Sequence, residues 1–282
     1  MPDSDSGRLV LAATPLGNPG DASQRLLEAL ASADVVAAED TRRVRTLAGA
    51  LGATITGKIV SYYDGVEAAR VPTLVEAIRS GQTVLVVTDA GMPSVSDPGF
   101  RLVSACVAEN LPVTCLPGPS AVITALALSG LPSDRFCFDG FVPRRPAERR
   151  RWFAALSTEP RTSIFFDSPR RLAATLADAV AVLGADRRAA VCRELTKTYE
   201  EVLRGSLGEL ERWAATEQVL GEITVVLAGA EPVAEPLEVL IERVRDRVAE
   251  GERLKDAVSA VAAGTAISKR DLYEAVHRED PA

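Results

Sequence analysis

The sequence has little histidine, and its few cysteines are scattered. Among 282 residues there are one histidine, His277, and four cysteines, Cys106, Cys115, Cys137 and Cys192. No Cys-x-x-Cys pair is present, so we predict no metal site and expect the cysteines to be reduced core residues. The position of His277 close to the C-terminus also disfavours a mechanism that depends on a histidine base.

Long hydrophobic runs and an excess of positive charge are missing too. No apolar run approaches the roughly 18 residues that span a bilayer. The amino terminus lacks a basic and then apolar signal segment, so we expect a cytoplasmic protein with no membrane partner. The net charge of −7 argues against a protein that coats nucleic acid nonspecifically, because that mode depends on many lysines and arginines.

The length and the 47% hydrophobic content of the chain suit two modest domains. Strands are expected near 8–13, 34–38, 58–62, 83–88 and 112–116, and helices near 22–32, 40–51, 68–80, 98–109 and 119–129. This alternation predicts a parallel α/β domain over 1–130. Apolar runs at 162–166, 189–192 and 223–227, with helical patterns near 169–183 and 206–217, predict a second α/β domain over 131–232.

The last segment, 233–282, has no strand pattern. It is expected to form three helices interrupted by Gly251 and Gly264, with Ser268 as the N-cap of the last one. The helix lengths and turn spacing are typical of a helix-turn-helix module. The segment 237–282 holds eight Lys or Arg against ten Asp or Glu, so a DNA partner is disfavoured and a structural or docking role is favoured at least as strongly.

Three loops rich in small and polar residues follow predicted strands of the first domain. They are Thr14–Asp21, Thr88–Gly99 and Leu116–Ala121. Because right-handed crossovers return parallel strands in one direction, all three loops should lie at the same sheet edge and line one polar crevice. None of them fits G-x-G-x-x-G or the P-loop pattern, so the predicted ligand is not a dinucleotide.

A basic segment, Pro143–Trp152, stands out from the acidic background. Its arginines are Arg144, Arg145, Arg149, Arg150 and Arg151. Two interpretations remain open at this point. The segment is either a nucleic-acid patch in which Trp152 stacks on a base, or a solvated helix face whose tryptophan turns into the core.

An ordered series of motifs resembles the ribosomal RNA ribose methyltransferases of the tetrapyrrole methylase superfamily. From about residue 8 to 229 the series reads TPLGNPGD, AEDTRR, TDAGMPSVSDPG, LPGPSAV, ALSGLP, FDGFVP, DSPRRL, RELTK and GE. The chain departs from the family pattern at Pro19 and Met92, where the family often has G-N-L-G-D and G-T-P. It also lacks the histidines that the family pattern places near 64–67 and at position 170.

The resemblance implies a fold and a reaction. It implies two α/β domains of the tetrapyrrole methylase type with a small C-terminal helical module, acting as a homodimer. The methyl donor would be S-adenosyl-L-methionine, and the acceptor the 2′-hydroxyl of a decoding-centre cytidine in 16S rRNA, presented in the assembled small ribosomal subunit or as free rRNA. The cofactor-binding positions carried over are Leu16, Gly91, Met92, Pro93, Val95, Ser120 and Ala121 from the first domain, and Phe166 and Leu195 from the second.

Several residues are candidates for the proton transfer that a hydroxyl acceptor requires. Glu39 and Asp40 close the second predicted strand, and Glu194 and Lys197 follow a strand of the second domain. Lys197 with a lowered pKa would accept the proton, or its charge would stabilise an alkoxide; the plainer alternative is a surface ion pair with Glu194.

The candidates for contacts to RNA phosphates are arginines. Arg42 and Arg43 follow Asp40, and the basic segment adds the five arginines named above. Two other functions remain open from the residues alone: a small-molecule methyltransferase of the precorrin type, and a regulator that binds DNA through the C-terminal helices. The acidic C-terminal segment counts against the DNA regulator. The arginines at 144–151 favour RNA without excluding an acidic tetrapyrrole, and the appended helices and the AEDTRR motif tilt the choice to RNA.

Overall fold

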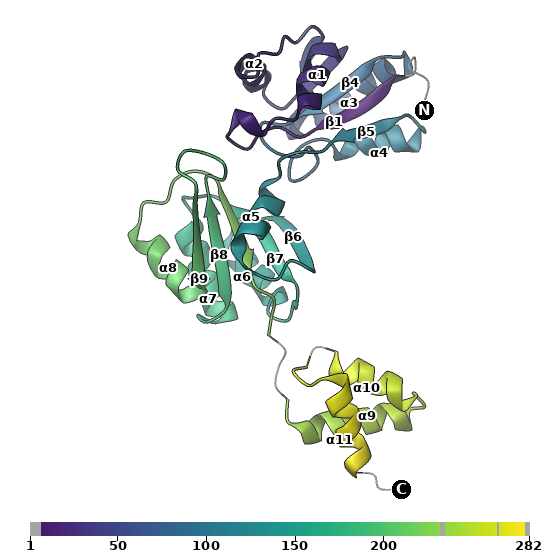
Figure 1. Ribbon diagram of the computed structural model, residues 1–282, viewed down its shortest axis with the longest axis vertical. Coiled ribbons are helices and arrows are strands. Elements are labelled where there is room, and N and C mark those ends of the chain that lie inside the picture. Colours follow the sequence, from purple (N-terminus) through teal and green to yellow (C-terminus); the bar gives the residue numbers. More distant parts are fainter. Residues whose placement is uncertain (1–6, 232–234, 264, 280–282) are drawn as a thin grey trace.

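The computed structural model describes residues 7–231, 235–263 and 265–279. Figure 1 shows two α/β domains, each built on one sheet, followed by a group of three helices at the opposite end of the molecule from the first domain. The predicted fold class is confirmed. The described helices include none that is long and apolar enough to cross a membrane.

The first sheet is entirely parallel. Its strands are β1 (Arg8–Ala12), β2 (Val35–Ala38), β3 (Lys58–Ser61), β4 (Thr83–Val87) and β5 (Val113–Leu116), in the order β3-β2-β4-β1-β5. Helices α1 (Gln24–Ser32), α2 (Thr41–Ala50), α3 (Asp64–Arg79) and α4 (Phe100–Ala108) connect them. The strands β4, β1 and β5 are neighbours, so the loops that follow them meet at one edge.

The second sheet is mixed. Its strands are β6 (Phe136–Phe141), β7 (Thr162–Asp167), β8 (Arg188–Arg193), β9 (Glu201–Ser206) and β10 (Ile223–Leu227), in the order β6-β7-β10-β8-β9. Among these described strands, only β6 and β7 pair in parallel. The edge strands β6 and β9 were not predicted, because neither has a buried stretch that would mark it in the sequence.

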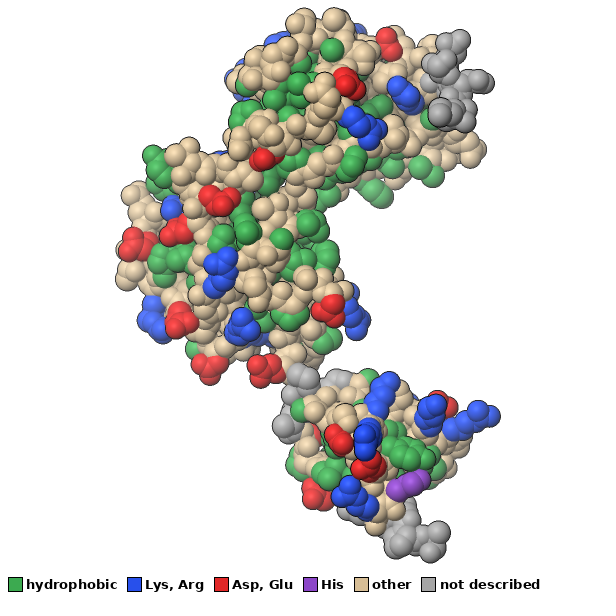
Figure 2. Space-filling view, in the orientation of Figure 1, with side chains coloured by type: hydrophobic (Ala, Val, Ile, Leu, Met, Phe, Trp, Pro, Cys, Tyr) green, Lys and Arg blue, Asp and Glu red, His purple; other side chains and the backbone are tan. Residues whose placement is uncertain are grey.

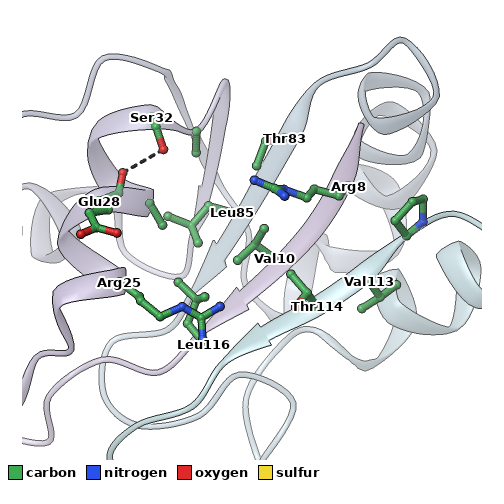
Figure 3. A pocket seen from close by; sticks show the side chains of 13 residues that line it. Arg8, Val10, Arg25, Glu28, Ser32, Thr83, Leu85, Val113, Thr114 and Leu116 are labelled. Carbon is green, nitrogen blue, oxygen red and sulfur yellow. Dashed lines mark hydrogen bonds between the residues drawn. The ribbon is translucent and has the colours of Figure 1, made fainter. Parts of the chain in front are cut away.

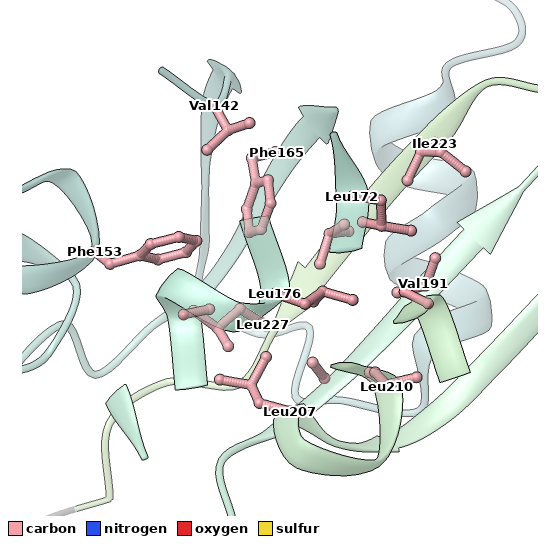
Figure 4. Packing of buried hydrophobic residues seen from close by; sticks show 14 of the residues in the cluster. Val142, Phe153, Phe165, Leu172, Leu176, Val191, Leu207, Leu210, Ile223 and Leu227 are labelled. Atoms are coloured by element: carbon pink, nitrogen blue, oxygen red, sulfur yellow. The ribbon is translucent and has the colours of Figure 1, made fainter. Parts of the chain in front are cut away.

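The two faces of the second sheet carry different helices. Helices α6 (Pro146–Ala155), α7 (Leu172–Leu183) and α8 (Leu207–Thr216) cover one face, where Phe153, Leu176 and Leu210 pack on Phe165 and Val191 (Figure 4). Helix α5 (Ala121–Ser129) packs on the other face, against β10, β8 and β7. The sequence placed α5 in the first domain. Its core contacts are with the second sheet, so the loop before Ala121 is the crossing point between the domains.

The C-terminal helices are α9 (Leu237–Ala249), α10 (Leu254–Ala262) and α11 (Lys269–Glu279), and they enclose a small core of their own. The Ser268 Oγ accepts a hydrogen bond from the Asp271 N–H at 3.1 Å, as expected of an N-cap. Gly251 ends α9 with a positive φ of 101°, and Gly264, the other predicted interruption, lies outside the described residues.

Candidate functional site

The three predicted loops meet at the carboxyl edge of the first sheet. The Thr14 N–H donates to the Gly91 carbonyl at 2.9 Å, and the Gly91 N–H donates to the Thr14 carbonyl at 3.0 Å. A side chain at Gly118 would begin 3.0 Å from the Ala13 Cβ. The first and second loops are therefore bridged by backbone hydrogen bonds, and the third packs closely on the first.

A cavity of about 330 Å³ opens beside these loops, between the two sheets. Its apolar wall includes Leu16, Ala90, Ala121, Phe166 and Ile223, and its polar wall includes Glu39, Arg43, Asp89, Asp97, Asp167 and Glu222. Both domains contribute, and carboxylates outnumber the single arginine. A neighbouring cavity of about 300 Å³ over α2 shares Leu16, Glu39, Arg43 and Asp89 with it. We call the first of these the interdomain cavity.

The predicted cofactor residues divide into four groups by position. Leu16, Ala121 and Phe166 line the interdomain cavity. Val95 and Leu195 pack in the same hydrophobic cluster behind that wall. Gly91 contributes backbone, because a side chain there would begin 3.4 Å from the Leu16 Cδ2. Met92, Pro93 and Ser120 belong to the converging loops but line neither of these two cavities.

The second loop is held in an unusual backbone conformation. Ser94 and Ser96 have φ values of 69° and 63°, and Gly91 and Gly99 have φ values of 83° and 142°. Residues other than glycine in this region cost about 1–3 kcal/mol each, and such strain clusters at functional sites. The strained pair lies just before Asp97 at the mouth of the interdomain cavity.

Buried Glu67 stabilises the end of the Thr88–Gly99 loop through hydrogen bonds. Its Oε1 accepts hydrogen bonds from the Gly99 N–H at 2.9 Å, the Arg101 N–H at 3.3 Å and the Tyr62 hydroxyl at 2.9 Å. Sequence reasoning missed Glu67 because it predicted α3 to begin near residue 68, which left this residue in a loop. A carboxylate at the first turn of a helix was the signal available.

Asp97 was also missed, although it lies within a motif quoted for its turn residues. Burial and the repulsion of Glu39, Asp64 and Asp89 raise the pKa of Asp97 to about 7. The signal in the sequence was the number of carboxylates that follow neighbouring strands. Their convergence depends on the strand order, which the sequence does not state.

Glu39 and Asp40 have different surroundings. Glu39 lines the interdomain cavity, accepts a hydrogen bond from the Asp89 N–H at 3.0 Å, and has a pKa raised by burial. Asp40 is the N-cap of α2, and the Arg42 guanidinium and backbone N–H hold the pKa of its carboxyl well below the usual range. The prediction that Asp40 accepts a proton is therefore wrong, because this carboxylate is tied up in capping and pairing.

The prediction of a lysine with a lowered pKa is wrong as well. Burial lowers the pKa of Lys197, but its hydrogen bond to Glu194 at 2.9 Å and its ion pair with Glu222 at 3.2 Å outweigh burial and raise it. Glu194 also accepts from the Glu222 N–H at 2.9 Å. Burial raises the pKa of Glu194, and these partners bring it below its usual value. Both side chains brace the turn after β8.

The Lys197 stem also joins the domains. A Cβ placed on Gly17 would lie 2.1 Å from the Lys197 Cγ, so the absence of a side chain at Gly17 allows the lysine to cross the first loop. The Asn18 N–H donates to the Thr196 Oγ1 at 3.3 Å next to this crossing. Lys197 therefore forms the ion pair with Glu194 that was the alternative to a catalytic role. Its contact with Gly17 also helps to hold the two domains together.

The basic segment turns only part of its charge outward. Arg149 is 5% exposed and paired with Asp178, so its predicted contact with RNA is wrong. Trp152 packs edge-on against Phe153 and Phe165, which confirms the core interpretation of that side chain. Four arginines of the segment remain exposed: Arg144, Arg145, Arg150 and Arg151. Arg42 and Arg43 are exposed too, although they pair with Asp40 and Asp89.

A third cavity, of about 480 Å³, lies away from the loops (Figure 3). It is formed between α1 and the face of β1, β4 and β5, with Arg8 and Arg25 among its lining residues. Open α/β sheets bind ligands outside the carboxyl ends of their strands. The interdomain cavity meets that condition and this one does not.

Comparison with known proteins shows the family. The model of the Tetrapyrrole (Corrin/Porphyrin) Methylases matches residues 8–211. A protein of Mycobacterium tuberculosis (strain ATCC 25618 / H37Rv) named "Ribosomal RNA small subunit methyltransferase I" is 63% identical over 96% of this chain and 95% of its own length. The protein of the same name from Escherichia coli O157:H7 is 38% identical over 96% of this chain and 95% of its own length.

Solved structures share the fold. The uroporphyrin-III C-methyltransferase of Thermus thermophilus, complexed with S-adenyl homocysteine, has a TM-score of 0.54 at 18% identity, covering 78% of this chain and 97% of that one. The cobalt precorrin-4 methyltransferase has a TM-score of 0.59 at 16% identity, covering 81% of this chain and 97% of that one. Together with the sequence matches, these likenesses show that the chain belongs to the ribosomal RNA small subunit methyltransferase I family of the tetrapyrrole methylases, which use S-adenosylmethionine.

Proposed function

We propose that this chain transfers a methyl group from S-adenosylmethionine to the small-subunit ribosomal RNA, at the 2′-hydroxyl of cytidine 1402. The observation that carries the proposal is the interdomain cavity, where an acidic and apolar pocket is bordered by exposed aromatic and arginine side chains. The names of the relatives support ribosomal RNA as the acceptor. The choice of the 2′-hydroxyl as acceptor atom and of the decoding-centre cytidine as acceptor nucleotide rests on the motif resemblance.

The residues of the cavity fit the methyl donor. S-adenosylmethionine carries a sulfonium and an ammonium group, and its nucleoside presents a flat apolar surface. The cavity offers the carboxylates of Glu39 and Asp89 to the positive groups and the apolar surfaces of Leu16 and Phe166 to the nucleoside. Its volume of about 330 Å³ lies in the range of small-molecule sites. When bound, S-adenosylmethionine would supply a methyl group that its sulfonium already activates for transfer.

The acceptor side of the cavity suits a nucleotide. Phe141 lines the cavity, is 61% exposed and stacks edge-on against Phe166 with ring centroids 5.4 Å apart. A register shift between Phe138 and Phe141, with Gly140 at a φ of 71°, interrupts the pairing of β6 with β7 directly before Phe141, which pairs with Phe166. An exposed aromatic face stacks on a nucleobase, and Arg144 and Arg145 follow within the next few residues for phosphate contacts.

The chain's own contribution to the reaction is positioning and electrostatics. Holding donor and acceptor in line converts a bimolecular step into an effectively unimolecular one, which removes several kcal/mol from the barrier. The strained loop and the brace at Glu67 fix the cavity wall before ligands arrive. Ion-paired Lys197 and Glu194 keep the second domain in register with the Gly17 loop.

Mapping ribose methylation in 16S rRNA tests the acceptor. Cells that lack the protein are expected to lose one 2′-O-methyl mark at the proposed cytidine, and purified protein with S-adenosylmethionine should restore it on small subunits from those cells. A parallel incubation of free 16S rRNA distinguishes the assembled subunit from naked RNA. An unchanged methylation map, with methyl transfer to a tetrapyrrole such as a precorrin instead, would establish the competing small-molecule function.

The exposed arginines of the basic segment are expected to hold RNA phosphates. Replacing Arg144, Arg145 and Arg151 together with alanine should weaken binding to the small subunit and flatten its dependence on salt, by about 0.7–0.9 in the log–log slope for each phosphate that is no longer neutralised. Affinity for S-adenosylmethionine should not change. Filter binding across a salt series measures the slope, with Lys58→Ala as the control because Lys58 is exposed at the far end of β3. An undiminished slope in the triple variant would assign these arginines to the solvated surface alone.

We also propose that the chain acts as a homodimer. Large apolar side chains are exposed on α5 and on the edge strand β6, at Ile123, Leu128 and Phe136. Figure 2 shows hydrophobic surface along the hollowed side of the first two domains. Exposed apolar area of this kind marks interaction surfaces, and light scattering coupled to size exclusion measures the mass of the particle in solution.

A further inference from the structure

We propose that the carboxylate of Asp97 accepts the proton of the acceptor hydroxyl during methyl transfer. This inference rests on the proposed function, because it assumes a hydroxyl acceptor. It assigns the proton to a residue that was not among the candidates from the sequence, and it replaces Lys197 and Asp40 in that role.

Among the carboxylates that line the interdomain cavity, Asp97 is the one that has no ion pair and accepts no backbone N–H within the described part of the chain, and the Thr88 hydroxyl is its hydrogen-bonding neighbour. Glu39 accepts the Asp89 N–H, and Asp89 in turn accepts from the Asp40 N–H and from Arg43. Two further carboxylates are ion-paired: Asp167 with Arg171 and Glu222 with Lys197. No ion pair or backbone N–H holds Asp97 in the described residues, so its carboxylate remains available to a substrate hydroxyl.

The position of Asp97 is fixed by its loop. Ser96, directly before it, has a φ of 63°, and Ser94 has a φ of 69°. Gly99 follows within two residues and donates its N–H to buried Glu67 at 2.9 Å. A side chain at Gly99 would begin 2.5 Å from the Ser94 Oγ, so the loop is folded tightly on itself. Strain retained beside a carboxylate that has no ion pair indicates a functional constraint rather than a packing requirement.

The charges around Asp97 suit a base that works near neutral pH. Glu39 reaches it from the end of β2, Asp64 from the start of α3 and Asp89 from its own loop, while Arg43 of α2 lines the same cavity. Burial and the three negative neighbours raise the pKa of Asp97 to about 7. A hydrogen bond with the Thr88 hydroxyl lowers this pKa by a smaller amount. A general base is most effective when its pKa lies near the operating pH. The carboxylate is then ionised above pH 7 and accepts a proton readily.

The step balances without another reactant. The bond between the sulfonium sulfur and the methyl carbon breaks, and its electron pair remains on sulfur as a neutral thioether. A bond forms between the acceptor oxygen and the methyl carbon. The proton of the hydroxyl passes to Asp97, and solvent takes it from the carboxylic acid after the products leave.

The first test is Asp97→Asn, which keeps the shape of the side chain and removes the base. Single-turnover methylation of small subunits should slow by about 100-fold or more, the usual contribution of a general base. Affinity for S-adenosylmethionine, measured by calorimetry, should stay within about threefold. The melting midpoint at pH 8 should rise by about 2–4 °C, because the substitution removes a half-buried charge among like charges.

The second test is Asp64→Asn, which leaves the cavity wall intact and removes one repulsive neighbour. Asp64 is exposed and does not line the interdomain cavity. The wild-type methylation rate should rise with pH, with a midpoint near pH 7, as Asp97 ionises. In Asp64→Asn this midpoint should move to lower pH, because one negative neighbour is lost, and the maximal rate should not change. If Asp97 had only a role in packing, the midpoint of the pH–rate profile would be the same in Asp64→Asn and the wild-type protein.

The outcomes separate this inference from the proposed function. If the wild-type protein methylates small subunits and Asp97→Asn does so at a similar rate, Asp97 is not the base and the proposed function stands. If Asp97→Asn loses cofactor affinity in proportion to its rate, the residue binds the donor instead. If the wild-type protein leaves ribosomal RNA unmethylated, both proposals fall together.

Discussion

Replacing Ala121 with tryptophan is expected to weaken the binding of S-adenosylmethionine by about 100-fold or more while the protein stays folded. Ala121 is the first residue of α5 and lines the interdomain cavity together with Phe166. An indole at this position competes with the ligand for a cavity of about 330 Å³. The decrease in affinity corresponds to about 2.7 kcal/mol or more, since each factor of ten is worth about 1.4 kcal/mol.

Helix α5 offers a matched control. Ala127 is exposed and does not line the cavity, so Ala127→Trp makes the same alanine-to-tryptophan change on the same helix without blocking the site. Calorimetry on both variants, with thermal unfolding to confirm the fold, measures the difference. Equal affinities for the cofactor in Ala121→Trp and the wild-type protein would place the donor site elsewhere.

The first sheet could be predicted from the sequence because its strands are short apolar runs separated by turn residues. The observed β1 to β5 begin and end within one residue of the expected ranges. The convergence of the three loops followed from the handedness of parallel crossovers. It is confirmed by the backbone pairing of Thr14 with Gly91 and by the close approach of Gly118 to Ala13. Local patterns and one topological rule were sufficient there.

The second sheet and the charges of the site were harder to predict for a different reason. Strands β6 and β9 lie at sheet edges, where half-exposed residues leave no apolar run. The states of Lys197, Asp40 and Asp97 depend on which charged groups the fold brings beside them and how deeply it buries them. A pKa is set by burial and by neighbouring charges, and neither quantity is written in the local sequence.

Helix α5 shows the same limit at the level of packing. The sequence predicts a helix near 119–129, and the structure buries its side chains Val122, Ala125 and Leu126. Which sheet they cover is decided by tertiary contacts, and they pack with Ile164 and Ala190 of the second sheet. The site consequently has a wall from each domain, and ligand binding depends on how the two domains are held together.

Replacing Arg149 with alanine is expected to destabilise the protein by about 3–5 kcal/mol, which is the largest effect on stability that we predict. The Arg149 Nε donates to the Asp178 Oδ2 at 2.7 Å, and both side chains are almost fully enclosed. Removal of the arginine would leave the Asp178 carboxylate buried with only the partly exposed Arg150 at 3.3 Å. A buried charge without its partner costs far more than the pair itself contributes.

Urea unfolding of three variants distinguishes this role from a surface charge. Arg150→Ala, whose side chain is 55% exposed in the wild-type protein, should cost no more than about 1 kcal/mol. The double variant Arg149→Met with Asp178→Leu should recover most of the stability that Arg149→Ala removes, because it eliminates both charges and keeps the volume filled. If Arg149→Ala unfolds at the wild-type urea concentration, the Arg149 side chain is not a buried structural partner, and its predicted role in RNA binding must be restored.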